Sequence, residues 1–185
     1  MRKIVLASAS PRRRELLTLA GVDFTVDAAD CDETLNEGIF PEDAVKILSE
    51  RKAEAVFEKR PDCTVIGADT VVACGGKILG KPADEAEAVK MLSLLSGKTH
   101  SVYTGVCIVN AEKKTVFAQK TDVTFYELTQ EEIESYVSTG DCLDKAGAYG
   151  IQSRGCVLVE KIDGDYFNVV GLPVAETVKA LNGMN

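Results

Sequence analysis

The sequence predicts an α/β fold with a mixed, twisted sheet and helices around it. Two observations carry this prediction. Short apolar runs typical of strands alternate with amphipathic runs typical of helices in the first part of the chain, and Gly75-Gly76 between two apolar runs indicates a β-hairpin further on. The 185 residues, of which 45% are hydrophobic, suit one domain over residues 1–185 with a substantial core.

Strands are expected where a short run is rich in apolar and β-branched residues. These runs are residues 3–7, 23–26, 63–73, 102–110, 115–126, 157–162 and 166–169. Two of the six cysteines, Cys63 and Cys107, fall inside these runs and none of the six forms a Cys-x-x-Cys pair, which favours reduced core thiols over disulfides or a zinc site. The single histidine, His100, also lies among strand-like residues, so we expect a structural role for it.

Helices are expected to begin near five residues that carry start signals: Pro11, Pro41, Asp84, Thr129 and Pro173. Proline suits the first helical position because its missing N–H would have no partner there. Two of the starts, with glutamate three residues later, match the capping box. Glycines stand where the helices should end, at positions 21, 97, 140 and 183.

The net charge of −8 argues against non-specific binding to nucleic acid or to a membrane surface, so a polyanion would need a local basic pocket. Such a pocket is predicted at residues 8–14, Ser-Ala-Ser-Pro-Arg-Arg-Arg, between the first strand and the first helix. Backbone N–H groups and arginine forks there suit phosphate. The alternative is a solvated basic turn. Residues 4–7 are too short for a signal peptide, and no run approaches transmembrane length.

Asp69 lies inside an almost continuous apolar strand, residues 66–72. A buried carboxylate is costly unless it is paired, so Asp69 needs a cation, a metal or hydrogen-bond donors. The alternative is a structural aspartate held by local bonds after Gly67. Glu33 ends an acidic stretch, residues 30–33, and becomes interesting only if it faces Asp69, because two carboxylates can share a divalent cation.

Two lysines are candidates for phosphate binding. Lys52 falls on the apolar stripe of the helix that starts at Pro41, so it either points into a pocket or snorkels to water. Lys81 lies in a Gly-Lys-Pro loop, where a surface lysine is the alternative. Residues 144–152 form a loop of small residues in which Tyr149 could pack against a base and Gln152 could read its edge. An ordinary loop is equally compatible with that pattern.

Seven segments, taken in order, resemble the Maf family of nucleotide pyrophosphatases. They are residues 8–17 (SASPRRRELL), 32–33 (DE), 51–53 (RKA), 67–72 (GADTVV), 80–82 (GKP), 100–105 (HSVYTG) and 144–152 (DKAGAYGIQ). The last segment resembles the branch acting on dTTP and UTP rather than the branch acting on 7-methyl-GTP. In that branch Arg12, Thr70 and Gln152 match positions associated with base choice. The chain departs from the family at Cys142-Leu143, where proline and an aromatic residue are common.

The resemblance implies a Maf/ITPase-like fold with two lobes around a nucleotide cleft, and hydrolysis of a nucleoside triphosphate to the monophosphate and pyrophosphate. It implies a substrate site of Ser8, Ser10, Arg12, Arg13, Lys52, Thr70, Lys145 and Gln152. Asp69 and Lys81 would be catalytic, with Asp69 either the general base or a metal ligand. Glu33 and Asp69 would hold Mg²⁺ or Mn²⁺.

The resemblance further implies a cytoplasmic, often dimeric protein that acts in nucleotide house-cleaning, with a link to septum formation in some members. The alternative hypothesis is a nucleotide-binding regulatory protein of cell division without significant turnover. It explains the basic pocket equally well, but not a carboxylate in an apolar strand beside that pocket. A single-stranded nucleic-acid binder is disfavoured by the acidic charge and by the aromatic content of 6%.

Overall fold

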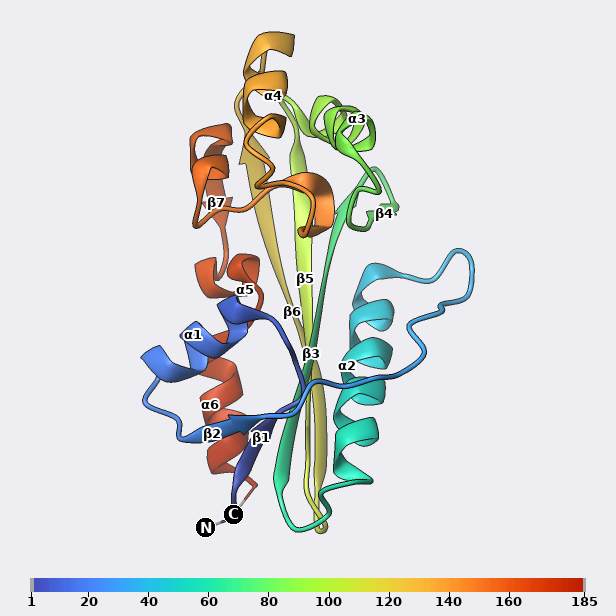
Figure 1. Cartoon of the computed structure of the whole chain (residues 1–185), viewed down its shortest axis with the longest axis vertical. Coiled ribbons are helices and arrows are strands. Elements are labelled where there is room, and N and C mark those ends of the chain that lie inside the picture. Colours follow the sequence, from blue (N-terminus) through green and yellow to red (C-terminus); the bar gives the residue numbers. More distant parts are fainter. Residues whose placement is uncertain (1, 185) are drawn as a thin grey trace. The chain divides into compact units, whose positions relative to one another are not determined.

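A computed structural model describes residues 2–184 of the chain (Figure 1). Their strands are β1 (Ile4–Leu6), β2 (Phe24–Val26), β3 (Thr64–Cys74), β4 (Lys77–Leu79), β5 (Thr99–Val109), β6 (Lys114–Phe125) and β7 (Val159–Asp163). Their helices are α1 (Pro11–Leu19), α2 (Pro41–Phe57), α3 (Glu85–Leu95), α4 (Gln130–Val137), α5 (Tyr166–Val170) and α6 (Val174–Asn182), with short 3₁₀ turns η1 (Ala146–Ala148) and η2 (Arg154–Leu158).

The described strands form one mixed sheet in the order β2-β1-β3-β5-β6-β7, and β4 pairs with β3. The sheet and its flanking helices confirm the predicted α/β class. β1 runs parallel to both β2 and β3, with Ile4 beside Phe24 and Thr64. β4 and β7 are antiparallel to their partners. The parallel part matters for function because ligands bind at the carboxyl ends of parallel strands.

All five predicted helix starts are confirmed, and Gly21, Gly97 and Gly140 have the positive φ typical of helix ends, whereas Gly183 follows α6 with a φ of −81°. Pro11 and Pro41 occupy first-turn positions. Thr129 forms the full capping box with Glu132. At α3, by contrast, the Asp84 side chain caps as predicted, but the Glu87 carboxylate accepts from the backbone N–H of Ala83 instead of that of Asp84.

The prediction of a strand at residues 166–169 is wrong, because these residues belong to helix α5. Asp165 explains the difference: its Oδ1 accepts a hydrogen bond from the Phe167 N–H at 2.8 Å, which turns the chain at the start of the helix. The helix also places Asn168 in the core, where its Nδ2 donates to Val102 O and Thr121 Oγ1 at 3.1 and 2.9 Å. The predicted strand at 157–162 begins only at Val159, since η2 precedes it.

The chain divides into two compact units. The first comprises residues 1–70, 104–119 and 171–185, and the second comprises residues 71–103 and 120–170. In the first unit α2 lies on one side of the strands and α1 and α6 on the other (Figure 1). Close backbone contact brings α2 onto the sheet: a Cβ on Gly67 would lie 2.2 Å from Ser49 O, and one on Gly105 would lie 2.2 Å from Val45 O. Only glycine allows this approach.

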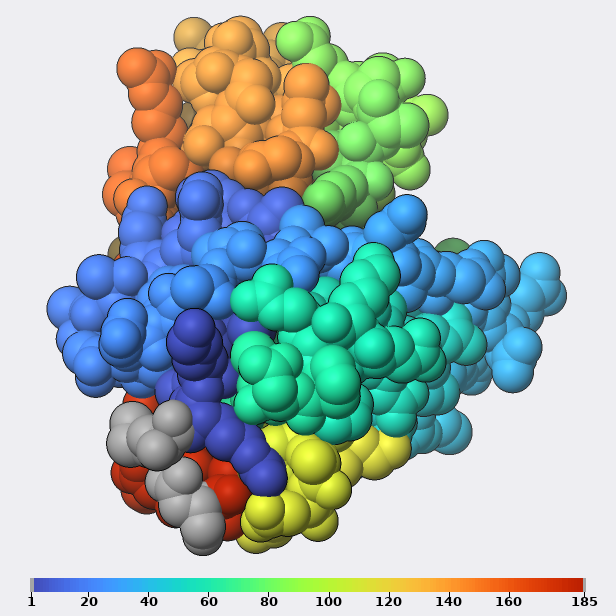
Figure 2. Space-filling view, turned by 60° about the horizontal axis from the view of Figure 1, so that its bottom comes forward, coloured from blue at the N-terminus to red at the C-terminus, as the bar shows by residue number. Residues whose placement is uncertain are grey.

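The far end of α2 lies against the turn between β5 and β6 (Figure 2, teal and yellow). Lys114, which follows that turn, pairs with Glu50 and Glu54 of α2. The paired carboxylates raise the pKa of Lys114, mainly because its ammonium group donates hydrogen bonds to Glu50 and Glu54. Ion pairs as well as packing therefore hold α2 against the turn between β5 and β6.

The second unit has an aromatic centre made of His100, Phe125 and Tyr149. Their rings meet edge to face, with centroids 4.9 Å apart for His100 and Phe125 and 4.7 Å for Phe125 and Tyr149. His100 Nε2 lies 2.8 Å from the Tyr149 hydroxyl, and among residues 2–184 its buried Nδ1 has no hydrogen-bond partner. The structural role predicted for His100 is thus confirmed by its burial in the core.

We expect this histidine to make the protein sensitive to acid. Burial lowers the pKa of His100 from 6.5 to about 4. Between those two pH values the histidine is protonated in the unfolded chain but neutral in the folded chain. Stability therefore falls as the pH drops through that window, by about 3 kcal/mol. Chemical denaturation at pH 7 and at pH 4.5 measures this loss. In His100→Gln it should be smaller by most of that amount, whereas equal losses in both proteins would contradict the assignment.

None of the helices within residues 2–184 combines the length and the apolar character needed to cross a membrane.

Candidate active site

The candidate site is built at the carboxyl ends of three neighbouring parallel strands in the first unit. β1 ends at Leu6 and is followed by Ser8, while β2 ends at Val26 and leads into the loop that carries Glu33. β3 pairs with β1 up to Ile66, and Asp69 lies three residues further on. The sheet topology therefore delivers residues from distant parts of the sequence to one edge, where α/β folds commonly bind ligands.

Alternation along β3 directs consecutive side chains to opposite faces of the sheet. Gly67 faces α2, as its contact with Ser49 shows, so Asp69 faces α2 as well. Thr70 faces the other side, where α1 lies. The site thus has an acidic half beside α2 and a basic half beside α1, separated by the backbone of one strand.

The acidic half is centred on the ammonium group of Lys52. Its Nζ lies 2.6 Å from Asp69 Oδ1 and 3.1 Å from Glu33 Oε1. The Lys52 and Asp69 side chains are only 13% and 12% exposed, so Lys52 points into the site and does not snorkel to water. The structure therefore brings together all three residues that the sequence suggested for this half, and Asp69 has the cationic partner that its burial demands.

Arg51, the neighbour of Lys52 on α2, holds the loop that carries Glu33. Its Nη1 donates to Asp32 O at 3.0 Å and to Thr34 O at 2.7 Å. The Thr34 N–H in turn donates to Asp32 Oδ1 at 2.9 Å, and the hydrogen bonds from Thr34 lower the pKa of Asp32. Because Arg51 binds the loop backbone on both sides of Glu33, helix α2 positions Glu33.

The basic half is centred on Arg13. Its guanidinium donates to Gly171 O at 2.9 Å, to Ser8 Oγ at 3.1 Å and to Thr70 Oγ1 at 3.1 Å. Burial lowers the pKa of Arg13, while the charge of Asp69 opposes this shift. Because a guanidinium carries five N–H groups, two remain for an anion after these contacts within residues 2–184.

Two residues of this half were missed by the sequence analysis. Thr104 is fully buried in β5, and its Oγ1 lies 2.9 Å from Thr70 Oγ1. Gly171 supplies the carbonyl that orients Arg13. Thr104 lies in the segment 100–105 that carries part of the resemblance, which is the signal that could have identified it. Gly171 lies in none of those segments.

The basic turn at the start of α1 combines backbone and side-chain groups. The Ser8 hydroxyl is buried and accepts from the Ser10 N–H at 3.3 Å. Ser10 is the residue before the helix, and its side chain does not cap it. Arg12 is half-buried, whereas Arg14 is exposed, and the first turn of α1 contains no acidic residue. This arrangement favours an anion at the start of the helix.

The remaining predicted residues belong to the second unit. Lys81 is exposed in the loop after β4, and Gln152 is exposed in the turn before η2. Lys145 is largely buried, with its Nζ near Asp141 and Asp144. The Tyr149 ring is 6% exposed and lies in the aromatic core, so the suggestion that it packs against a base is wrong.

The acidic half also has the chemistry of a divalent-cation site. Asp69 and Glu33 converge on one point, which Lys52 occupies with its positive charge. No group of three or more His, Cys, Asp or Glu side chains suited to a metal exists within residues 2–184. Two carboxylates without further protein ligands fit Mg²⁺ or Mn²⁺, because such ions complete their coordination with substrate phosphates and water.

Comparison with known proteins identifies a family and several relatives of this chain. The family model described as "Maf-like protein" matches residues 3–184. A dTTP/UTP pyrophosphatase of Bacillus thuringiensis subsp. konkukian (strain 97-27) is 53% identical over 185 residues, which cover 100% of this chain and 97% of the relative. The dTTP/UTP pyrophosphatase of Bacillus cereus (strain AH820) gives the same values. That of Bacillus pumilus (strain SAFR-032) is 52% identical over 181 residues, covering 98% and 96%.

Proposed function

This chain belongs to the Maf family, and on that premise we propose that it is an enzyme that hydrolyses dTTP and UTP to the monophosphate and pyrophosphate. Relatives about half identical over nearly their whole length carry the name dTTP/UTP pyrophosphatase. The observation that carries the proposal is the buried Asp69–Lys52 pair at the carboxyl edge of the sheet. A protein that only binds nucleotides has no need of a carboxylate in that position.

The first unit supplies the groups that would bind the triphosphate. We assign Arg12, Arg13 and the backbone around Ser8 and Ser10 to phosphate oxygens. Lys52 has three N–H donors, of which two point to carboxylates, so the third is available to phosphate. Positive groups placed in advance around the phosphates stabilise the charge that develops as the bond between the α- and β-phosphates breaks.

Asp69 would act on the attacking water. Its Oδ1 accepts a hydrogen bond from Lys52, which leaves Oδ2 for a second partner. That partner is either the proton of the water or a divalent cation held together with Glu33. When bound, such a cation would neutralise phosphate charge and lower the pKa of its water. In both cases the hydrogen bond from Lys52 holds Asp69 in place.

Lys81, Lys145 and Gln152 belong to the second unit, and their assignment to the same substrate rests on the motifs they share with the family. Lys81 is proposed to act on the phosphates and Gln152 on the base. Thr70 and Arg12 match family positions associated with base choice, so Arg12 would serve both the base and the phosphates. The loop that contains Lys145 would shape the space for a single ring. We extend the resemblance in the same way to a cytoplasmic location and a homodimer.

The proposed function is tested by product analysis. Purified protein should convert dTTP and UTP to the monophosphate and pyrophosphate, and a screen of standard and modified nucleotides should rank these two first. Binding of dTTP or UTP without any product would instead support a nucleotide-binding regulator. Faster turnover of GTP or 7-methyl-GTP than of UTP would overturn the assignment to this branch.

We expect turnover to require a divalent cation, with Mg²⁺ or Mn²⁺ preferred over Zn²⁺. The ligands available are hard carboxylate and phosphate oxygens, which favour hard cations. Exhaustive chelation should abolish activity, and added Mg²⁺ or Mn²⁺ should restore it. Full activity in the chelated protein would exclude a metal role for Glu33 and Asp69.

Gln152→Ala should lose pyrimidine preference more than it loses basal hydrolysis. The side-chain amide offers one donor and one acceptor, which match the edge of uracil or thymine. Leaving that edge unpaired costs about 1–3 kcal/mol, or roughly tenfold to hundredfold in discrimination. The measurement is the ratio of kcat/KM for UTP to that for GTP. An unchanged ratio would remove Gln152 from base selection.

A further inference from the structure

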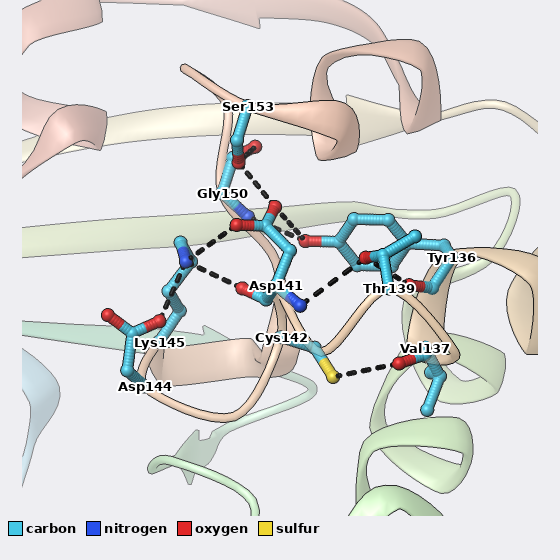
Figure 3. A network of polar contacts seen from close by, with 9 residues as sticks. All are labelled: Tyr136, Val137, Thr139, Asp141, Cys142, Asp144, Lys145, Gly150 and Ser153. Carbon is cyan, nitrogen blue, oxygen red and sulfur yellow. Dashed lines mark hydrogen bonds and ion pairs between the residues drawn. The ribbon is translucent and has the colours of Figure 1, made fainter.

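The carboxylate of Asp141 holds together the two ends of the loop that leads to Gln152 (Figure 3). Its Oδ1 accepts from Lys145 Nζ at 3.0 Å, near the start of the loop. Its Oδ2 accepts from Ser153 Oγ, directly after Gln152, and from the Tyr136 hydroxyl at 3.1 Å. Tyr136, Lys145 and Ser153 are thereby linked through the single side chain of Asp141, and these contacts form a ring.

Further contacts close the same ring. The Tyr136 hydroxyl accepts from the Gly150 N–H at 3.1 Å, and Ser153 Oγ, whose one hydrogen is shared with Asp141, lies 3.1 Å from Gly150 O. A Cβ on Gly150 would lie 2.4 Å from Lys145 Cε, so the lysine stem lies directly across this glycine. The residues just before Gln152 are therefore fixed by Tyr136, Lys145 and Ser153 together.

Lys145 directs its charge into the ring. Its ammonium donates to Asp141 O at 2.5 Å, to Asp141 Oδ1 at 3.0 Å and to Asp144 Oδ1 at 2.7 Å. These three bonds match the three donors of an ammonium group. The Lys145 side chain is only 11% exposed, and that of Asp141 is 22% exposed. In this state Lys145 has no N–H left for a phosphate.

Asp141 is ionised at neutral pH in this setting. Burial acts to raise its pKa, but hydrogen bonds from Ser153 and Lys145 outweigh it, so the pKa of Asp141 is lowered. Hydrogen bonds to an ionised carboxylate are stronger than the same number of hydrogen bonds between neutral groups. The ring is therefore held by its strongest available acceptor.

We propose that Asp141 is a positioning residue for base selection: by closing this ring it sets the place of Gln152, without touching the substrate itself. The proposal rests on the proposed function, in which Gln152 reads the base. It assigns Lys145 to the shape of the loop instead of to direct contact with phosphate.

A double-mutant cycle between Asp141→Ala and Gln152→Ala tests the proposal. The measured quantities are kcat and KM for UTP and for GTP in the wild type, both single variants and the double variant. Asp141→Ala should lower the UTP-over-GTP preference by about tenfold, mainly through KM for UTP, which corresponds to about 1.4 kcal/mol. The double variant should show no lower preference than Gln152→Ala alone, since both changes remove the same contact. Asp141→Glu should recover most of the preference.

Asp122→Ala is the matched control. Asp122 also accepts from a serine and a lysine, Ser101 Oγ at 2.6 Å and Lys120 Nζ at 3.0 Å, but these donors lie on β5 and β6, outside the ring. It should lower stability without changing the ratio of kcat/KM values for UTP and GTP. If Asp141→Ala does not fold, Ser153→Ala, which removes one contact to Asp141, carries the same cycle with a smaller effect.

Amide hydrogen exchange separates this proposal from the proposed function. Faster exchange at residues 145–153 in Asp141→Ala, with little change in Asp122→Ala, is expected whether or not the protein hydrolyses UTP. Unchanged exchange there would overturn the ring as the element that holds the loop. Changes in preference that multiply in the double variant would overturn the action through Gln152. A wild type that hydrolyses neither dTTP nor UTP would refute the proposed function and, with it, the role in base selection.

Discussion

Asp69→Asn is expected to lower turnover of dTTP and UTP by about 10³-fold while nucleotide binding and the fold stay largely intact. The amide keeps the shape of the side chain and can still accept from Lys52, whose Nζ lies 2.6 Å away in the wild type. It can neither take a proton from water nor hold a divalent cation well. The loss should therefore appear in kcat, measured by release of pyrophosphate.

Asp27→Asn is the control for Asp69→Asn. Asp27 pairs with Arg60 at 3.3 Å in the same unit, so its change also removes one carboxylate charge from an ion pair. Turnover by this variant should stay close to that of the wild type. Wild-type turnover by purified Asp69→Asn would show that the carboxylate is neither base nor metal ligand.

Lys52→Met should be the most destabilising of the changes at the site. The methionine fills a similar volume but leaves Asp69 without its cation in a largely buried position. Removing one partner of a buried ion pair costs about 3 kcal/mol or more. Turnover should fall as well, because Asp69 and Glu33 lose the group that orients them and the phosphate loses a donor. Denaturation and kinetic measurements on the same preparation report both losses.

A second substitution identifies the cause of this destabilisation. In Lys52→Met with Asp69→Asn the unpaired charge is absent, so much of the lost stability should return while activity should not. Lys46→Met is the matched control on the same helix, since Lys46 pairs with exposed Glu42 at 2.5 Å. It should cost well under 1 kcal/mol. A stability of the double variant as low as that of Lys52→Met would point to packing as the cause.

Local signals explain what could be predicted from the sequence about the fold. Proline and capping residues act within one turn of the chain, so the starts of α1 and α2 are predictable from Pro11 and Pro41. The turn at Gly75-Gly76 is predictable in the same way, because glycine tolerates positive φ, and both residues have positive φ in the structure. The prediction failed at α5, where Asp165 and the burial of Asn168 outweigh the strand-like composition of residues 166–169.

The candidate site divides along the same line. The amino-acid pattern alone identified the unusual residues: Asp69 in an apolar strand, Lys52 on an apolar helix face, and a cluster of arginines at the start of α1. The contacts between Lys52 and the carboxylates of Glu33 and Asp69, and the hydrogen bond from Arg13 to Gly171, become visible in the folded chain. The folded chain also shows that Lys145 turns inward to Asp141. The burial of a charged side chain can be predicted from the apolar residues next to it in the sequence. Its partner of opposite charge cannot, because sheet order and strand alternation determine which distant segments lie together.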